Sequence, residues 1–147
     1  KNKTKKSLNF CRKIITSISM TTKNTFKVVM LGEGRVGKTS LTLKYCVNKF
    51  DENQESTINA SYLDKEVKFG DQSKKLAIWD TAGQEKFAAM APIYYRDAEG
   101  AVLVYDITYR ESFDKVQKWM AELKNHADED IDIVIAGNKC DRASERQ

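Results

Sequence analysis

Apolar and polar positions follow two different periods along this chain of 147 residues. Residues 26–31 form a short β-branched run, and continuous apolar runs at 100–107 and 131–137 are typical of strands covered on both faces. The segments 60–69 and 74–80 flank a Gly70-Asp71 turn, which predicts a β-hairpin. Helical spacing occurs in 40–50 and again in a second set of apolar residues, Phe113, Val116, Met120 and Leu123. Strands that alternate with helices predict an α/β domain with a mostly parallel sheet.

Charge is distributed unevenly along the chain. Six of the 25 Lys and Arg residues, and no acidic residue, precede Ser19, so that 19 basic and 21 acidic residues remain. We therefore expect one soluble domain over 23–147 that does not bind nucleic acid, preceded by a basic leader at 1–22. The leader is interpreted as disordered or as an artefact of a translated fragment. The alternative is a basic amphipathic targeting segment, since Phe10, Ile14 and Ile18 recur at helical spacing.

The three cysteines, Cys11, Cys46 and Cys140, are odd in number and far apart. None belongs to a CxxC pair or to a cluster with histidine, so the sequence predicts neither a disulfide framework nor a zinc site. We expect a reducing, cytoplasmic compartment. His126 and Trp119 are expected to lie on a solvated helix and are assigned no chemistry.

Three of the seven glycines lie between the first apolar run and the first predicted helix. With Lys38 and Thr39 they include the pattern G-x-x-x-x-G-K-[ST], which begins at Gly32 and has its second glycine at Gly37. Glycines let main-chain N–H groups curl around phosphate oxygens, and the following helix directs its positive end at them. Lys38 is expected to neutralise the outer phosphates, and the Thr39 hydroxyl suits Mg²⁺. A plain glycine turn with a surface lysine is the alternative.

A second motif, "NKCD", follows the last apolar run and supplies Asn138, Lys139 and Asp141. Ligands of open α/β sheets bind at the carboxyl ends of the strands, where this motif is expected to lie. A fixed carboxylate at Asp141 accepts two hydrogen bonds from the ring N–H and exocyclic amine of guanine, a pair of donors that adenine lacks. The motif therefore favours GTP and GDP as ligands. A polar junction between strand and loop is the alternative.

Five motifs together resemble those of a Rab-type small GTPase. They are "GEGRVGKT" at 32–39, "ST" at 56–57, "WDTAGQE" at 79–85, "YYRDAEGAVLVYDIT" at 94–108 and "NKCD" at 138–141. The likeness covers 26–142, and the Ala60-Ser61 pair points to an endosomal subgroup of that family.

The resemblance implies a P-loop NTPase fold, with three α/β/α layers and a mostly parallel sheet that carries one antiparallel edge strand. It also implies that this chain lacks the family's last strand, last helix and prenylated cysteine tail. We therefore expect an incomplete G domain, an uncovered sheet edge at 131–136 that favours aggregation, and micromolar or weaker GTP binding by the 147 residues alone. Positions 97–99, Asp-Ala-Glu, depart from the family pattern, and a local effect is expected.

Individual roles follow from the same resemblance. Thr57 and Asp80 complete the Mg²⁺ site that Thr39 begins, and Thr57 closes a first switch loop while triphosphate is bound. Gly83 meets the γ-phosphate, and Gln84 orients the attacking water as the catalytic residue. Phe50 stacks on guanine, or else is an ordinary core residue. The full set of expected nucleotide contacts is Gly32, Glu33, Gly34, Arg35, Val36, Gly37, Lys38, Thr39, Ser40, Phe50, Thr57, Gly83, Asn138, Lys139 and Asp141.

Gly34 and Arg35 bear on how fast GTP is hydrolysed. Gly34 leaves room for an arginine that an activating protein supplies, without which the resemblance implies slow hydrolysis. Arg35 either points outward or acts as a built-in arginine finger.

Three aromatic residues, Tyr62, Trp79 and Tyr94, are similar to the triad through which Rab proteins contact effectors. Ordinary sheet packing is the alternative for each of them alone. The period-two alternation of 76–80 places Leu76 and Ile78 on one face of a strand and Trp79 on the other.

The sequence therefore favours a monomeric, Mg²⁺-dependent GTPase switch. By resemblance it regulates vesicle traffic on the cytosolic face of endosomal or Golgi-type membranes, which it reaches only through a lipidated tail. Its expected partners are GTP and GDP, effectors, an exchange factor and a GTPase-activating protein. The alternative is a truncated, non-functional or non-hydrolysing nucleotide-binding fragment. An ATP-consuming enzyme is disfavoured by Asp141.

Overall fold

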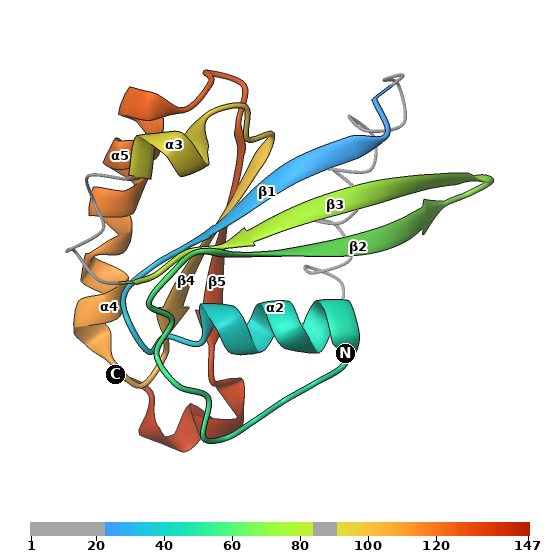
Figure 1. The fold of residues 1–147 in the computed structure, drawn as a ribbon. Helices are drawn as coiled ribbons and strands as arrows, with labels where there is room; N and C mark the ends of the chain where they lie inside the picture. The colour runs from blue at the N-terminus through green and yellow to red at the C-terminus, as the bar shows by residue number, and fades with distance from the viewer. Residues whose placement is uncertain (1–22, 84–90) are drawn as a thin grey trace.

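A single five-stranded sheet organises the part of the chain that the structure describes, residues 23–83 and 91–147 of a computed structural model (Figure 1). The strands are β1 (Thr25–Leu31), β2 (Ser61–Phe69), β3 (Gln72–Asp80), β4 (Gly100–Asp106) and β5 (Asp132–Asn138), in the order β2-β3-β1-β4-β5. β1 pairs in parallel with β3 and β4, and β4 pairs in parallel with β5. β2 and β3 form the predicted antiparallel hairpin. The mostly parallel sheet with one antiparallel edge strand is therefore confirmed.

Helices cover both faces of this sheet (Figure 1). One face carries α2 (Lys38–Val47), which begins directly after the predicted phosphate loop. The other carries α3 (Ala91–Tyr95), α4 (Arg110–Asp114) and α5 (Val116–His126). A 3-10 helix, η2 (Cys140–Glu145), follows β5. This arrangement gives the three predicted α/β/α layers. Within 23–83 and 91–147, no helix is long and apolar enough to cross a membrane.

The hydrophobic core lies in two clusters, one on each face of the sheet. Alternation along β1 sends Val29 and Leu31 to one face and Met30 to the other. On the α5 face, Val29 and Leu31 pack with Tyr95, Ala98, Ala101, Leu103, Val116, Trp119 and Leu123. On the α2 face, the cluster consists of Met30, Val36, Ile78 and Val104, with Leu41, Cys46, Leu76 and Val102 packed against it. Because β1 and β4 are covered on both sides, their sequences are mostly apolar.

Two expectations about the helices were wrong. Phe113 was placed on one helix with Val116, but the structure has two helices, which meet at Lys115. The hydroxyl of the buried Ser112 bonds the main chain of Asp106, which ties the short α4 to the end of β4. Phe113 is consequently exposed and packs edge-on against Tyr105.

Trp119 was expected on a solvated helix and instead belongs to the core, with only 9% of its surface exposed. It shares the buried stripe of α5 with Val116 and Leu123, since positions three and four apart along a helix lie on one face. His126, by contrast, is exposed as expected.

The outer strand β5 forms one edge of the described sheet, as expected. Its side chains are only partly covered, and Ile135 is among the exposed large hydrophobic residues. The consequence for aggregation stays a prediction.

Candidate functional site

The parallel strands β1, β3, β4 and β5 all end at the same edge of the sheet (Figure 1). Their pairing sets Met30 beside Asp80, Leu31 beside Leu103, and Asp106 beside Asn138. The segments that follow these strands carry both nucleotide motifs of the sequence. The fold therefore brings residues about one hundred positions apart to one end of the sheet.

The loop from Gly32 to Gly37 is held in a conformation that requires its glycines. Gly32 and Gly37 have φ angles of 138° and 95°, which L residues rarely adopt. A Cβ at Gly32 would lie 2.1 Å from the carbonyl oxygen of Val104, and one at Gly37 would lie 2.4 Å from Nδ2 of Asn138. Arg35 is exposed at φ 62°. The glycines thus let the loop lie directly on its neighbours.

Lys38 is buried beneath this loop, with 5% of its surface exposed. Its Nζ donates hydrogen bonds to the carbonyl oxygens of Gly32 and Glu33, both at 2.9 Å. Burial lowers the pKa of Lys38 to about 8, although the charges of Asp80 and Glu33 partly oppose this. The loop therefore holds a cation that two neutral carbonyls solvate only partly, and an anion bound in the loop would stabilise it further.

Three oxygen-bearing side chains converge beside Lys38. The Thr39 hydroxyl donates to Oδ2 of Asp80 at 2.6 Å and also contacts the Thr57 hydroxyl. Asp80 is 1% exposed, and within the described part of the chain its Oδ1 has no hydrogen-bond partner. Burial raises the pKa of Asp80, while the hydrogen bond from Thr39 and the charge of Lys38 oppose it. The residues predicted to hold the metal are thus brought together.

These oxygens fit Mg²⁺. A buried carboxylate oxygen without a partner requires a cation or donor, and Mg²⁺ prefers oxygen ligands from one or two protein groups plus phosphates and water. No group of three or more His, Cys, Asp or Glu side chains that could hold a metal occurs in 23–83 or 91–147. The site therefore suits an ion that arrives with a phosphate ligand and does not suit an all-protein metal cage.

Gly83, in the segment that follows β3, lies against the phosphate loop. A Cβ at this buried position would lie 2.4 Å from Nζ of Lys38 and 2.5 Å from the carbonyl oxygen of Glu33. Only glycine lets the main chain approach the loop this closely. Gln84, predicted to be catalytic, lies outside the described residues.

Two residues of the base motif are fixed by contacts. Asn138 donates from Nδ2 to the carbonyl oxygen of Val36 at 2.8 Å, which joins the end of β5 to the phosphate loop. Lys139, at φ 60°, pairs its Nζ with Oδ2 of Asp106 at 2.6 Å. Burial alone would raise the pKa of Asp106, but hydrogen bonds from Lys139 and Thr108 outweigh it and lower that pKa.

Asp141 and Phe50 are predicted to contact the base, and both are exposed. Asp141 lies in η2, and 65% of the Phe50 surface is accessible. Within 23–83 and 91–147, no hydrogen bond or ring contact fixes either side chain. The exposure of Phe50 rules out a core residue, and its role toward guanine stays a prediction.

Comparison with known proteins agrees with this geometry. Residues 27–147 match the Ras family over more than half of the chain. The chain belongs to the Ras family. It is 55% identical over 121 residues to the Ras-related protein Rab-21 of Bos taurus and to that of Homo sapiens, and 51% identical over 120 residues to that of Geodia cydonium. Each alignment covers 82% of this chain. The chain spans about half the length of these relatives, 54%, 54% and 52% respectively. The predicted Rab-type resemblance is confirmed.

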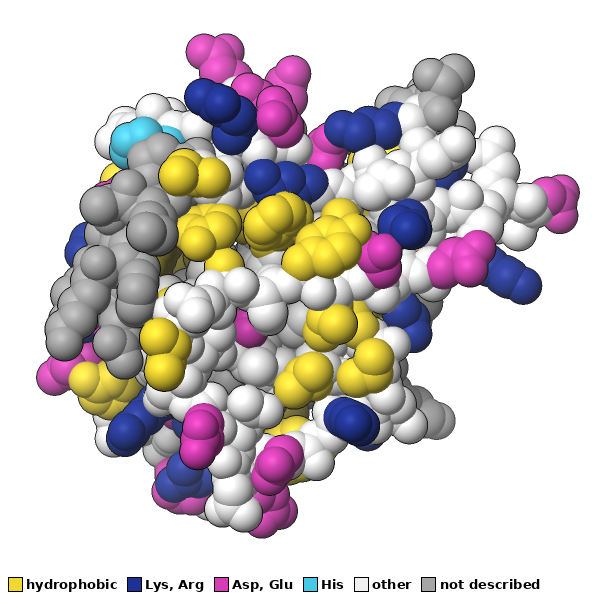
Figure 2. All heavy atoms as spheres, viewed as in Figure 1, with side chains coloured by type: hydrophobic (Ala, Val, Ile, Leu, Met, Phe, Trp, Pro, Cys, Tyr) yellow, Lys and Arg dark blue, Asp and Glu magenta, His cyan; other side chains and the backbone are white. Residues whose placement is uncertain are grey.

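The aromatic residues of this Ras-family chain form one connected surface group. Tyr62 meets Trp79 edge-on at 5.5 Å between ring centres, and Trp79 lies 6.3 Å from Tyr94. Nζ of Lys27 sits 5.0 Å above the Trp79 ring. Leu76 and Ile78 pack on the opposite face of β3, which confirms the predicted alternation. Figure 2 shows hydrophobic side chains gathered on one face of the molecule, with basic side chains beside them.

Three further residues of the site in this Ras-family domain were not predicted from the sequence. Asp106 holds Lys139, Ser112 holds the main chain of Asp106, and Lys115 pairs with Glu33 at 2.9 Å. Asp106 ends an apolar strand, and the pairing of β4 with β5 places it beside Asn138 of the base motif. Lys115 carries no local pattern, because its partner is 82 positions away.

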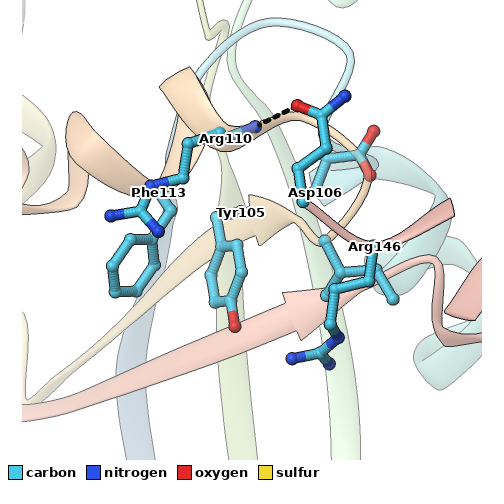
Figure 3. Close-up of a pocket in the computed structure, with 7 residues that line it drawn as sticks. Tyr105, Asp106, Arg110, Phe113 and Arg146 are labelled. Carbon is cyan, nitrogen blue, oxygen red and sulfur yellow. Dashed lines mark hydrogen bonds between the residues drawn. The ribbon is translucent and has the colours of Figure 1, made fainter.

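A separate pocket of about 160 Å³ lies beyond Asp106 (Figure 3). The rings of Tyr105 and Phe113 form one wall, and the main-chain N–H of Arg110 donates to Oε1 of Gln147 at 3.2 Å. Ile107 and Arg146 also line the pocket. It shares Asp106 with the nucleotide site and lies outside the phosphate loop.

Proposed function

We propose that this protein is a Mg²⁺-dependent switch that binds GTP and hydrolyses it to GDP and phosphate. The observation that carries the proposal is the junction of two motifs: Asn138 bonds the loop that encloses Lys38, so that a phosphate cradle and a base motif form one unit. The convergent oxygens of Thr39, Thr57 and Asp80 support a bound magnesium ion.

The proposed mechanism assigns each residue a task. Main-chain N–H groups of the loop and the Lys38 ammonium bind the phosphates, and Asp141 selects guanine. Thr39, Thr57 and Asp80 would hold Mg²⁺, which supplies positive charge to the phosphates when bound. Gln84 orients a water whose oxygen bonds to the γ-phosphorus as the bond to the bridging oxygen breaks. Thr57 holds its loop against the site only while the γ-phosphate is present.

Partners and location belong to the same proposal. The group of exposed Tyr62 and half-buried Trp79 and Tyr94 supports an effector surface, since aromatic residues at one patch are typical of binding hot spots. The likeness to Rab-21 supports a role in vesicle traffic, with an exchange factor, a GTPase-activating protein and endosomal membranes as its setting.

Single-turnover hydrolysis of bound GTP tests this proposal. Gly34→Val and Gln84→Leu are expected to keep GTP binding and to depress turnover, both alone and with an activating protein. The Gly34 substitution has room in the loop, because the nearest atom to a Cβ there is the Gly83 carbonyl oxygen at 3.8 Å. Gln117→Leu on the exposed face of α5 is the matched control and should hydrolyse normally. Normal partner-stimulated turnover in either site variant would contradict the assignment.

Arg35 provides a second test of how hydrolysis is catalysed. Its exposed position at the loop surface favours an outward side chain that leaves an arginine to be supplied by a partner. Arg35→Ala should then hydrolyse GTP at the normal intrinsic rate. A large loss of intrinsic rate would instead support the built-in finger.

A further inference from the structure

An ion pair joins the phosphate loop to the junction of α4 and α5. Nζ of Lys115 lies 2.9 Å from Oε2 of Glu33, whose side chain is largely covered. Glu33 raises the pKa of Lys115, because its hydrogen bond and its charge favour the protonated form of the lysine. The pair is a direct side-chain contact between the α4–α5 junction and the phosphate loop.

Glu33 touches the working parts of the loop with its main chain. Its carbonyl oxygen accepts a hydrogen bond from Nζ of Lys38 at 2.9 Å. The same oxygen lies against Gly83, where an added Cβ would be only 2.5 Å away. A shift of Glu33 therefore displaces both the Lys38 ammonium and the approach of Gly83. The Glu33 side chain, on the same residue, is held by Lys115.

Lys115 is well placed to hold Glu33 because its own main chain is anchored. Its N–H donates to the carbonyl oxygen of Glu111 at 3.1 Å, and its carbonyl accepts from the N–H of Trp119 at 3.2 Å. The neighbouring Val116 and Trp119 belong to the buried core. The lysine side chain thus extends from a fixed point of the main chain to Glu33.

We propose that Lys115 is a positioning residue of the nucleotide site, which keeps the phosphate loop in its binding geometry by holding the Glu33 side chain. This inference rests on the proposed function. It assigns a task to a residue outside the set of expected nucleotide contacts. Loss of the pair should loosen the loop and speed release of the bound nucleotide.

The dissociation rate of a fluorescent guanosine diphosphate tests this role. Lys115→Met is expected to raise the rate about two- to fivefold, the range for one partly exposed ion pair, and Lys115→Arg should restore it. Glu33→Gln should raise the rate by a similar factor. The double variant should be no faster than either single variant, because both changes remove one interaction. Added salt should accelerate release from the unaltered protein more than from Lys115→Met.

Lys118→Met is the matched control, since Lys118 is an exposed lysine three residues further along the same segment. It should release nucleotide at the unaltered rate, and its unfolding temperature should equal that of Lys115→Met. An unchanged release rate in Lys115→Met would overturn this inference and leave the proposed function intact. The same holds if the effects of the two single variants multiply in the double variant. An unaltered protein that retains no guanine nucleotide contradicts the proposed function, and this inference with it.

Discussion

The phosphate end and the base end of the site are built differently. At the phosphate end, Lys38 and Asp80 are almost fully buried, and the loop carbonyls and Thr39 already bind them. At the base end, Asp141 and Phe50 are exposed and fixed by no described contact. A preformed, desolvated site loses little order on binding, whereas exposed side chains must be ordered by the ligand. The difference indicates that affinity comes mainly from the phosphate end and selectivity from the base end.

The largest effect is expected from Lys38→Met at the buried end. Removing the ammonium leaves the phosphates without their main cation in a desolvated loop, and GTP and GDP affinity should fall about a thousandfold. Equilibrium titration with fluorescent nucleotides measures the loss. Lys44→Met, on the exposed side of α2, should bind normally. A Lys38→Met protein with nearly unaltered affinity would remove the basis of the comparison.

At the exposed end, Asp141→Asn should affect selectivity before it affects phosphate binding. The amide can no longer accept two hydrogen bonds as an anion, so GTP affinity should fall about a hundredfold. Affinity for inorganic tripolyphosphate should not change, because the cradle is intact. Competition titrations with both ligands distinguish the two ends. An equal loss for the two ligands would mean that Asp141 acts on the loop.

The pH dependence of folding should report the buried charge of the phosphate end. Lys38 has a pKa of about 8 in the folded protein and about 10.5 when unfolded, so the unfolded chain binds the proton more tightly. The free energy of unfolding of the ligand-free protein should therefore rise, by roughly 2 kcal/mol, between pH 8 and pH 10.5. Denaturant titrations at the two pH values measure it. The rise should be absent in Lys38→Met, and its persistence there would assign it to another group.

Among the effects on nucleotide affinity, the smallest is expected where the two ends meet. Asn138→Ala removes the hydrogen bond to Val36, and affinity for GTP and GDP should fall about tenfold each. Asn125→Ala, on exposed α5, is the matched control. The Asn138 variant should also weaken tripolyphosphate binding, which Asp141→Asn does not. Unaltered tripolyphosphate binding would show that the two ends act independently.

The mostly parallel sheet was predicted from strands that alternate with helices, and the three layers from the resemblance to Rab-type GTPases. The sequence predicted the hairpin because Gly70, at φ 58°, is a residue that readily adopts such an angle. It failed at Phe113, because the spacing from Phe113 to Val116 is helical and suggested one helix. Hydrogen bonds between Ser112 and Asp106 instead fix a separate short helix. The prediction also failed at Trp119, which was expected to be a solvated residue although its spacing from Val116 and Leu123 places it on the same apolar face of the helix.

Among the site residues too, those in local motifs were predicted and those that act through long-range contacts were not. Gly32, Lys38 and Asn138 belong to local motifs and are confirmed as neighbours by the fold. Asp106 and Lys115 act through side chains from distant segments, and no local pattern announces such contacts. Pairing of strands decides which polar residues meet, and it becomes visible only when the sheet order is known.

Competition between magnesium-loaded GTP and ATP tests the central claim most directly. We expect the cradle of loop N–H groups and Lys38 to bind any nucleoside triphosphate, while Asp141 selects the base. The protein should then prefer GTP by about 10⁴-fold, since adenine leaves that carboxylate without its two donors. Equal uptake of ATP and GTP would contradict the account.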